Sequence, residues 1–182
     1  MTWQTIARRV RVPLGFLFAA FFLWLAHPTW VSLTWSLFLT VPGVWLRGYA
    51  SGYVKKNAEL ATTGPYAYTR NPLYLGSMLI AFGFAGASTR PGLAVALAVL
   101  FLAVYLPTIR SEEAFLRGRF TAFEAYAKAV PRLLPRITPA PTHSGFGSFS
   151  RALYVKHREY NALIGAGAIY ATLVARMLLF AH

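Results

Sequence analysis

The sequence predicts an all-α, polytopic membrane protein with about five transmembrane helices and one cytoplasmic amphipathic helix. Composition is the first reason: 57% of the 182 residues are hydrophobic and only 13% are charged, where a soluble domain carries roughly 25%. The mean hydropathy of +0.48 agrees with this. Pattern is the second reason, because five apolar runs alternate with polar, basic segments.

The five apolar runs define the expected membrane helices, and they cover residues 12–26, 30–46, 73–87, 92–107 and 162–180. Very short polar turns separate the first from the second run and the third from the fourth, which predicts two antiparallel helical hairpins. Pro42 and Gly43 predict a kink or an end in the last turn of the second helix. Small residues such as Gly76 and Gly83 allow close helix packing in lipid.

The basic residues predict the orientation in the membrane. Sixteen of the 18 Lys and Arg residues lie before the first run, in segment 47–72 or in segment 110–158. The positive-inside rule therefore places the N-terminus and both polar segments in the cytoplasm and the C-terminus outside. The net charge of +13 also raises nucleic acid as a partner. Cationic flanks on an anionic membrane surface explain it better, so we expect membrane lipids and no nucleic acid.

The absence of cysteine excludes a disulfide scaffold and a cysteine nucleophile. The four histidines are scattered without the spacing of metal ligands, so no metal site is expected.

We expect one membrane domain over residues 1–182. It comprises an N-terminal helical hairpin (1–46), a core with cofactor loop, hairpin and amphipathic helix (47–137), a linker (138–158) and a C-terminal transmembrane helix (159–182). The amphipathic helix is predicted within 110–136, because apolar positions 115, 116, 120, 123, 126 and 130 recur at three-to-four spacing. Its basic face is expected at the lipid headgroups, and it comprises Arg117, Arg119, Lys128, Arg132 and Arg136.

The segment from Gly64 to Gly76 is the strongest candidate for a functional site. Gly-Pro at its start and Asn71-Pro72 in its middle predict turns, with Pro72 opening the next helix. If the third and fourth helices form a hairpin, this loop and Glu112-Glu113 meet at one membrane face. Tyrosine faces attract cations, carboxylates accept from ammonium or hydroxyl groups, and arginine grips a carboxylate at two points. The combination suits a zwitterionic ligand with a positively charged centre.

These residues carry a family resemblance. The pattern Gly64-x-Tyr66-x-Tyr68-x-Arg70-Asn71-Pro72-x-Tyr74-x-Gly76 resembles the signature of the isoprenylcysteine carboxyl methyltransferase and phospholipid methyltransferase group. Glu112-Glu113-x-x-Leu116-x-x-x-Phe120, followed by Tyr126 and Val130-Pro131-Arg132, is similar to the second block of that family. The resemblance covers roughly residues 47 to 137. The histidine that usually follows the arginine is Asn71 in this chain.

The resemblance implies an integral membrane enzyme that transfers the methyl group of S-adenosylmethionine to a lipophilic acceptor at the cytoplasmic face. The acceptor could be a carboxylate, a thiol or an amine. Arg70 and Glu113 are implied as catalytic residues, Arg70 to orient a carboxylate and Glu113 as a base for an acceptor that must lose a proton. The implied cofactor-binding residues are Gly64, Tyr66, Tyr68, Arg70, Asn71, Pro72, Tyr74, Glu112 and Glu113.

Two other classes of function remain open from sequence. One is an NADPH-dependent membrane reductase of similar architecture, although such chains are usually longer. The other is a non-catalytic membrane scaffold or lipid-binding protein that uses the basic face of the amphipathic segment.

Overall fold

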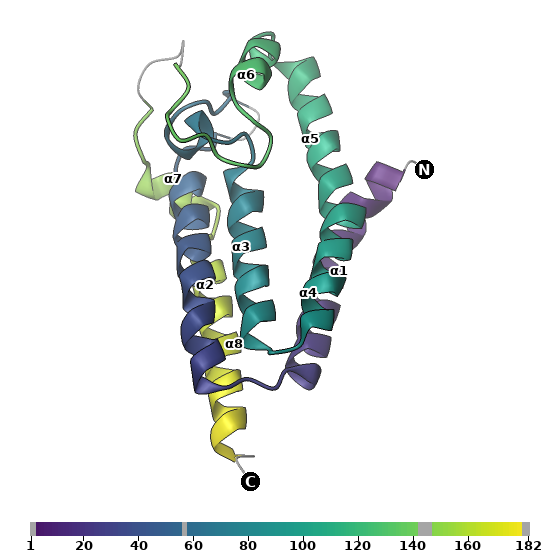
Figure 1. Ribbon diagram of the computed structural model, residues 1–182. Helices are drawn as coiled ribbons and strands as arrows, with labels where there is room; N and C mark the ends of the chain where they lie inside the picture. The colour runs from purple at the N-terminus through teal and green to yellow at the C-terminus, as the bar shows by residue number, and fades with distance from the viewer. Residues whose placement is uncertain (1–2, 56–57, 142–146, 180–182) are drawn as a thin grey trace.

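The computed structural model describes residues 3–55, 58–141 and 147–179, and these residues form helices and no strand. Figure 1 shows the order of the elements along the chain. They are α1 (Trp3–Leu25), α2 (Trp30–Ser51), the 3₁₀ turn η1 (Gly64–Ala67), α3 (Pro72–Ala87), α4 (Pro91–Leu100), the π segment η2 (Phe101–Tyr105), α5 (Leu106–Arg119), α6 (Phe123–Ala129), α7 (Arg151–Lys156) and α8 (Tyr160–Leu179). The all-α prediction is confirmed.

The long helices run along one common direction, and the loops with η1, α6 and α7 gather at one end (Figure 1). We call this the polar end. The C-terminus lies at the opposite end of the helices. The two polar segments expected from sequence, one before α3 and one after the apolar part of the long α4–α5 helix, thus meet at the polar end.

Helix α2 packs on α3 almost backbone to backbone. A Cβ atom at Gly43 would lie 2.8 Å from the carbonyl oxygen of Gly76, and a Cβ at Gly83 would overlap the hydroxyl of Thr40. Contacts this close need glycine on at least one side. Of the two outcomes expected at Pro42-Gly43, a kink or an end, the end does not occur, since the helix continues to Ser51 and carries Arg47 to the polar end.

The helix predicted to end at Pro107 instead runs unbroken from Pro91 to Arg119. Proline has no N–H to donate, and one π turn precedes it, in which the Leu106 N–H bonds to the Phe101 carbonyl. A π turn inserts a residue into a helix and changes the direction of its side chains. The helix therefore passes Pro107 and delivers Glu112 and Glu113 to the polar end.

The prediction of a single amphipathic helix within 110–136 was wrong. Residues up to Arg119 belong to α5, Phe120 is extended (φ −127°, ψ 116°), and only Phe123–Ala129 is helical beyond it. Pro131 and Pro135 supply no N–H donors, so helix does not resume. In the segment expected as a linker, residues 151–156 form α7, and residues 142–146 lie outside the described residues.

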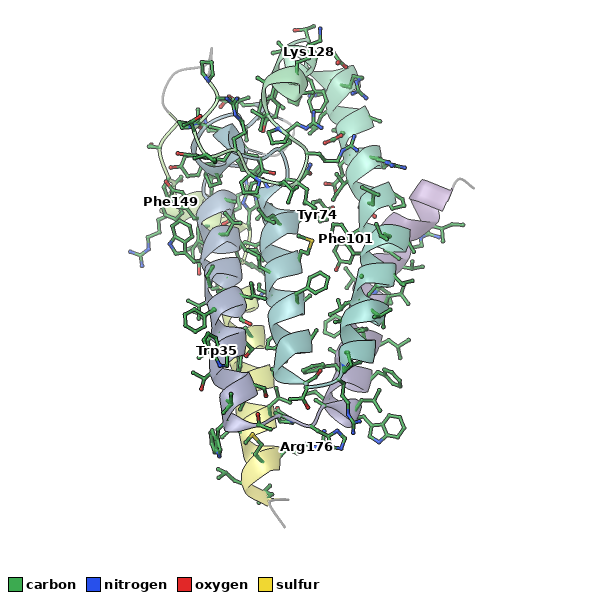
Figure 2. All side chains as sticks on the ribbon, in the orientation of Figure 1. Trp35, Tyr74, Phe101, Lys128, Phe149 and Arg176 are labelled. Carbon is green, nitrogen blue, oxygen red and sulfur yellow. The ribbon has the colours of Figure 1, made fainter. Side chains whose placement is uncertain are left out.

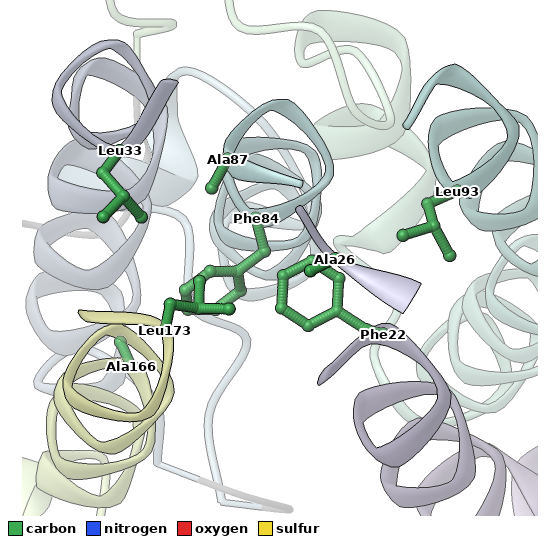
Figure 3. Packing of buried hydrophobic residues seen from close by; sticks show 8 residues of the cluster. All are labelled: Phe22, Ala26, Leu33, Phe84, Ala87, Leu93, Ala166 and Leu173. Carbon is green, nitrogen blue, oxygen red and sulfur yellow. The ribbon is translucent and has the colours of Figure 1, made fainter. Parts of the chain in front are cut away.

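The apolar core joins α1, α3 and α8, as Figure 3 shows for Phe22, Phe84 and Leu173. A polar contact adds to it, because the Tyr170 hydroxyl lies 2.6 Å from Ser36 Oγ and 3.0 Å from Thr40 Oγ1. Hydrogen bonds between hydroxyl groups hold helices together where no water is available. The C-terminal helix is therefore an integral part of the bundle.

Two of the described helices are long and apolar enough to cross a membrane, Pro91–Arg119 and Tyr160–Leu179. The apolar stretches Val12–Leu25 and Pro72–Ala87 are shorter. Length and hydropathy thus mark two candidate spans among the described residues, and the five transmembrane helices expected from sequence stay a prediction.

Candidate functional site

A cavity of about 400 Å³ opens at the polar end, where the loop after α2, the loop before α3, α5 and α6 meet. We call it the polar cavity. Figure 2 shows Tyr74 directed into the space between α3 and the long α4–α5 helix. The lining residues are Val54, Lys55, Glu59, Leu60, Ala61, Tyr66, Arg70, Asn71, Leu73, Tyr74, Glu112, Glu113, Phe115, Leu116, Phe123 and Tyr126.

Glu113 is the centre of the polar network in this cavity, and its side chain is only 6% exposed. Arg132 Nε donates to Glu113 Oε2 at 2.9 Å, and Arg132 Nη2 lies at an ion-pair distance of 2.8 Å from the same oxygen. Asn71 Nδ2 donates to Glu113 Oε1 at 3.3 Å and to the Arg132 carbonyl at 3.0 Å. Arg132 and the Asn71 amide, together with Arg70 on the other side, fix the Glu113 carboxylate in position.

Arg70 lies beside Glu113 without a well-aligned hydrogen bond to it. Its Nε is 3.2 Å from Glu113 Oε1, an ion-pair distance, yet this buried Nε has no partner in hydrogen-bond geometry. Nη1 of the same guanidinium donates to the Ala127 carbonyl at 2.9 Å. A buried donor without an aligned acceptor is costly unless something else occupies it. The Nε of Arg70 is therefore a donor whose hydrogen-bonding capacity is not met by an aligned acceptor.

Glu112 lies one residue from this network and has a different partner. The Tyr74 hydroxyl donates to Glu112 Oε1 at 2.8 Å. The Tyr74 ring also meets Tyr105 of η2 edge to face, with centroids 6.0 Å apart. These contacts link α3 to the long helix across the cavity.

The segment after α6 turns back and binds the loop before α3. The Arg70 N–H donates to the Pro131 carbonyl at 3.0 Å, and the Ala140 N–H donates to the Ala67 carbonyl at 2.9 Å. Buried Thr69 donates its hydroxyl to the Leu133 carbonyl at 3.0 Å. These bonds use backbone groups that no helix satisfies, and they fix Arg70 and Asn71 against Arg132.

Two tyrosines form an inner wall of the polar cavity. The Tyr126 hydroxyl donates to the Tyr66 carbonyl at 2.8 Å. Burial raises the pKa of both phenols well above the usual value, with a further increase for Tyr66 from the neighbouring Tyr126. Both side chains are therefore neutral hydrogen-bonding groups near neutral pH.

The structure brings most of the residues predicted for the site into one cavity, namely Tyr66, Arg70, Asn71, Tyr74, Glu112 and Glu113. Three others lie elsewhere. Gly64 and Tyr68 line a separate surface hollow beside Trp45. Gly64 has φ +58° and faces the Tyr53 ring, so it shapes the loop. Pro72 is buried as the first residue of α3.

Arg132 was expected on a headgroup-facing surface and was not predicted as part of the site. The signal that could have found it was its position directly after Val130-Pro131 in the second motif block. Lys55 and Glu59 were also missed as lining residues. They pair with each other at 2.9 Å and are largely exposed.

The comparison with protein families identifies the class of protein to which this fold belongs. A family model described as phospholipid methyltransferase matches residues 14–122, which is more than half of the chain. The chain therefore belongs to the phospholipid methyltransferase family. The matched region contains the two glutamates and the whole loop of Arg70, and it ends before Arg132 and α8.

Two curated relatives carry names that refer to metal resistance. The chain is 36% identical over 118 residues to the nickel-cobalt-cadmium resistance protein NccN of Alcaligenes xylosoxydans xylosoxydans, covering 63% of this chain and 54% of the relative. It is 35% identical over 117 residues to the cobalt-zinc-cadmium resistance protein CzcN of Cupriavidus metallidurans, covering 60% and 53%. The chain spans about half the length of these relatives. No solved structure matches it.

Among the residues that the structure describes, no group of three or more His, Cys, Asp or Glu side chains could hold a metal ion.

Proposed function

We propose that this protein transfers the methyl group of S-adenosylmethionine to a lipophilic acceptor, with the cofactor held in the polar cavity. The observation that carries the proposal is the meeting of Arg70, Asn71 and Tyr74 with Glu112 and Glu113 around one cavity, about 40 residues apart in sequence. The family membership supports methyl transfer as the reaction class.

The residues of the polar cavity suit this cofactor. A volume of about 400 Å³ falls within the roughly 300–1,000 Å³ usual for small-molecule and cofactor sites. Three carboxylates and two cations line it, and Arg132 on Glu113 balances the charge, so the cavity suits a zwitterionic ligand. The buried Nε of Arg70 lacks an aligned acceptor, which a ligand carboxylate would provide.

Each residue then has a role. Arg70 would bind the carboxylate of the cofactor, and Glu112 would accept from its amino group or ribose. The faces of Tyr66 and Phe123 would lie beside the positive charge. S-adenosylmethionine supplies an electrophilic methyl group on a sulfonium. Alignment of donor and acceptor accounts for most of the catalysis in such a transfer.

Glu113 fits a positioning role better than that of a base. Both of its oxygens already face cationic or amide donors, so taking up a proton would weaken contacts to Arg70 and Arg132 together. This favours an acceptor that reacts without losing a proton, such as a carboxylate.

We further propose that the helices cross the membrane several times with the polar end in the cytoplasm, where S-adenosylmethionine is available. The basic segments at that end support this orientation through the positive-inside rule. Metal resistance, taken from the names of the relatives, is the physiological setting in which we would look for the activity.

The test is transfer of tritium from methyl-labelled S-adenosylmethionine into the organic extract of membranes that contain the protein. We expect incorporation with the wild type and a loss of roughly a hundredfold in Arg70→Ala. Arg119→Ala, on the exposed end of α5, is the matched control and should retain activity. Equal incorporation by wild type, Arg70→Ala and empty membranes would contradict the proposal.

A further inference from the structure

A hollow on the outside of the polar end has no part in the proposed reaction. It has a volume of about 570 Å³ and lies between the end of α2, the loop that follows α2, and α7. Its charged lining residues are Lys55, Glu59 and Lys156, and Ser148 and Ser150 add hydroxyl groups. The lining carries one more positive than negative charge, and we call this site the basic hollow.

The two lysines of the basic hollow can bind an anion. Lys55 pairs with Glu59 at 2.9 Å, but both side chains are more than half exposed. An exposed ion pair contributes little, so an anion with more oxygen acceptors can draw Lys55 away from Glu59. Lys156 forms no ion pair with any of the described residues. Ser150 Oγ accepts from the Leu153 N–H at 3.4 Å, and its own hydrogen can still be donated.

Aromatic rings on the outer face of α2 mark the depth of the basic hollow. Trp45 stacks on Tyr49 with centroids 5.2 Å apart, and Tyr49 stacks on Phe149 at 5.9 Å. Figure 2 shows Phe149 beside α7, on the same side of α2 as Trp35, which lies nearer the opposite end of the helix. Trp35 and Trp45 are both exposed. Tryptophan and tyrosine gather at the membrane–water interface. In the membrane arrangement proposed above, this stack is therefore where the lipid-facing side of α2 reaches the head groups.

The basic hollow begins one turn beyond this stack. Positions three or four apart share one helix face, so Gly52 and Tyr53 follow Tyr49 on it, and both line the hollow. Phe149 covers Gly52 so closely that a Cβ atom at Gly52 would overlap the ring. The hollow thus continues the lipid-facing side of α2 into the layer where lipid phosphates lie.

We propose that the basic hollow binds the phosphate of an anionic phospholipid from the cytoplasmic leaflet, through Lys55 and Lys156. The acyl chains of this lipid lie along the outer face of α2, past Phe149 and Trp45. Basic pockets on the cytoplasmic side of membrane helices bind anionic head groups of this kind. A zwitterionic lipid brings an ammonium group of its own, which the two lysines repel. This site is separate from the cofactor and the acceptor of the proposed reaction.

Lys156 is the position that tests this site alone. Lys55, Glu59, Leu60 and Ala61 line both the basic hollow and the polar cavity, so changes at Lys55 would also alter the proposed cofactor site. Lys156 lines the hollow and is not among the residues of the polar cavity. Its removal should therefore affect lipid binding without affecting binding of S-adenosylhomocysteine.

The test is native mass spectrometry of the full chain in detergent micelles that contain one phospholipid at a time. Phosphatidylglycerol and phosphatidylcholine with identical acyl chains are compared. We expect the tightest site for phosphatidylglycerol to have at least tenfold higher affinity than that for phosphatidylcholine. Lys156→Gln should weaken phosphatidylglycerol binding roughly fivefold, which is the contribution of one lysine near an anionic lipid surface, and should leave phosphatidylcholine binding unchanged.

Lys128 provides the matched control. It is exposed in the last turn of α6 at the same end of the molecule (Figure 2), and it does not line the basic hollow. Lys128→Gln should bind phosphatidylglycerol like the wild type. An equal loss in Lys128→Gln and Lys156→Gln would mean a general attraction to the basic polar end and would overturn the proposal, as would equal affinity for the two lipids.

A soluble phosphate ester distinguishes a lipid site from a site for a free metabolite. Glycerol 3-phosphate carries the same phosphate chemistry without acyl chains, and it is added to the wild type with phosphatidylglycerol bound. We expect no displacement at millimolar glycerol 3-phosphate, because the acyl chains on α2 contribute to lipid binding. Displacement at micromolar concentration would show a site for a soluble phosphate and overturn the assignment to a lipid.

Discussion

Arg132 donates a hydrogen bond from Nε to Glu113 Oε2 at 2.9 Å, and its Nη2 lies 2.8 Å from the same oxygen, an ion pair that ties the segment after α6 to α5. Arg70 approaches the other oxygen of the same carboxylate at 3.2 Å. The loop before α3, the long helix and the returning segment therefore share one anionic centre. Removing the Glu113 carboxylate should therefore weaken the packing of all three segments.

Glu113→Gln should lower the stability of the protein by about 2–3 kcal/mol, because two guanidinium groups lose their counter-charge in a largely buried site. The measurement is thermal unfolding of the variant in nanodiscs. Glu124→Gln is the matched control, since Glu124 pairs with Arg117 at an exposed site and should cost less than about 0.5 kcal/mol. Equal effects of the two changes would contradict a structural role for the Glu113 network.

Glu112→Gln should separate binding from stability. Tyr74 can still donate to the amide oxygen, so unfolding should shift little, while the lost negative charge should weaken S-adenosylhomocysteine binding roughly tenfold. Calorimetry and thermal unfolding on one preparation measure both. A large fall in stability with unchanged affinity would show that Glu112 serves the fold alone.

The close packing of α2 on α3 predicts a contrast between two glycines of α3. Gly83→Ala should cost about 1–3 kcal/mol, because the new methyl group would overlap the Thr40 hydroxyl and the backbone around it. Gly86→Ala should be neutral or slightly stabilising, since a Cβ there meets nothing within 4 Å and alanine favours helix. Thermal unfolding of the two variants compares them directly. Matching melting temperatures would mean that the helices are further apart than described.

Tyr66 and Tyr126 predict a loss of stability at alkaline pH. Tyrosine in the unfolded chain ionises near pH 10, and burial raises the pKa of both residues above that value in the fold. Their contribution is therefore complete below about pH 10 and is lost as the pH rises above it. Melting temperatures across this range should fall less steeply in Tyr126→Phe than in the wild type. Parallel curves would contradict the assignment.

Much of the polar cavity could be predicted from sequence because its motifs flank a hairpin. Asn71 and Glu113 lie 42 residues apart, yet one apolar turn brings the ends of the hairpin together. The same hairpin brings Tyr74 next to Glu112, so their contact at 2.8 Å could also be predicted.

The parts that were missed depend on backbone geometry that periodicity does not reveal. A π turn before Pro107 let one helix continue where a break was expected. The break fell instead at Phe120, which freed Arg132 to turn back onto Glu113. Arg47 and Glu159 pair across 112 residues, and no local pattern points to such a contact.

The most direct test of the proposed function is calorimetric titration of S-adenosylhomocysteine into the nanodisc-reconstituted protein, beside Arg70→Ala and with NADPH as the competing ligand. Micromolar binding by the wild type, lost in the variant and unaffected by NADPH, is the predicted result. Binding of NADPH in place of S-adenosylhomocysteine would contradict methyl transfer and favour a reductase. Binding of neither by folded protein would leave a lipid-binding role for the bundle.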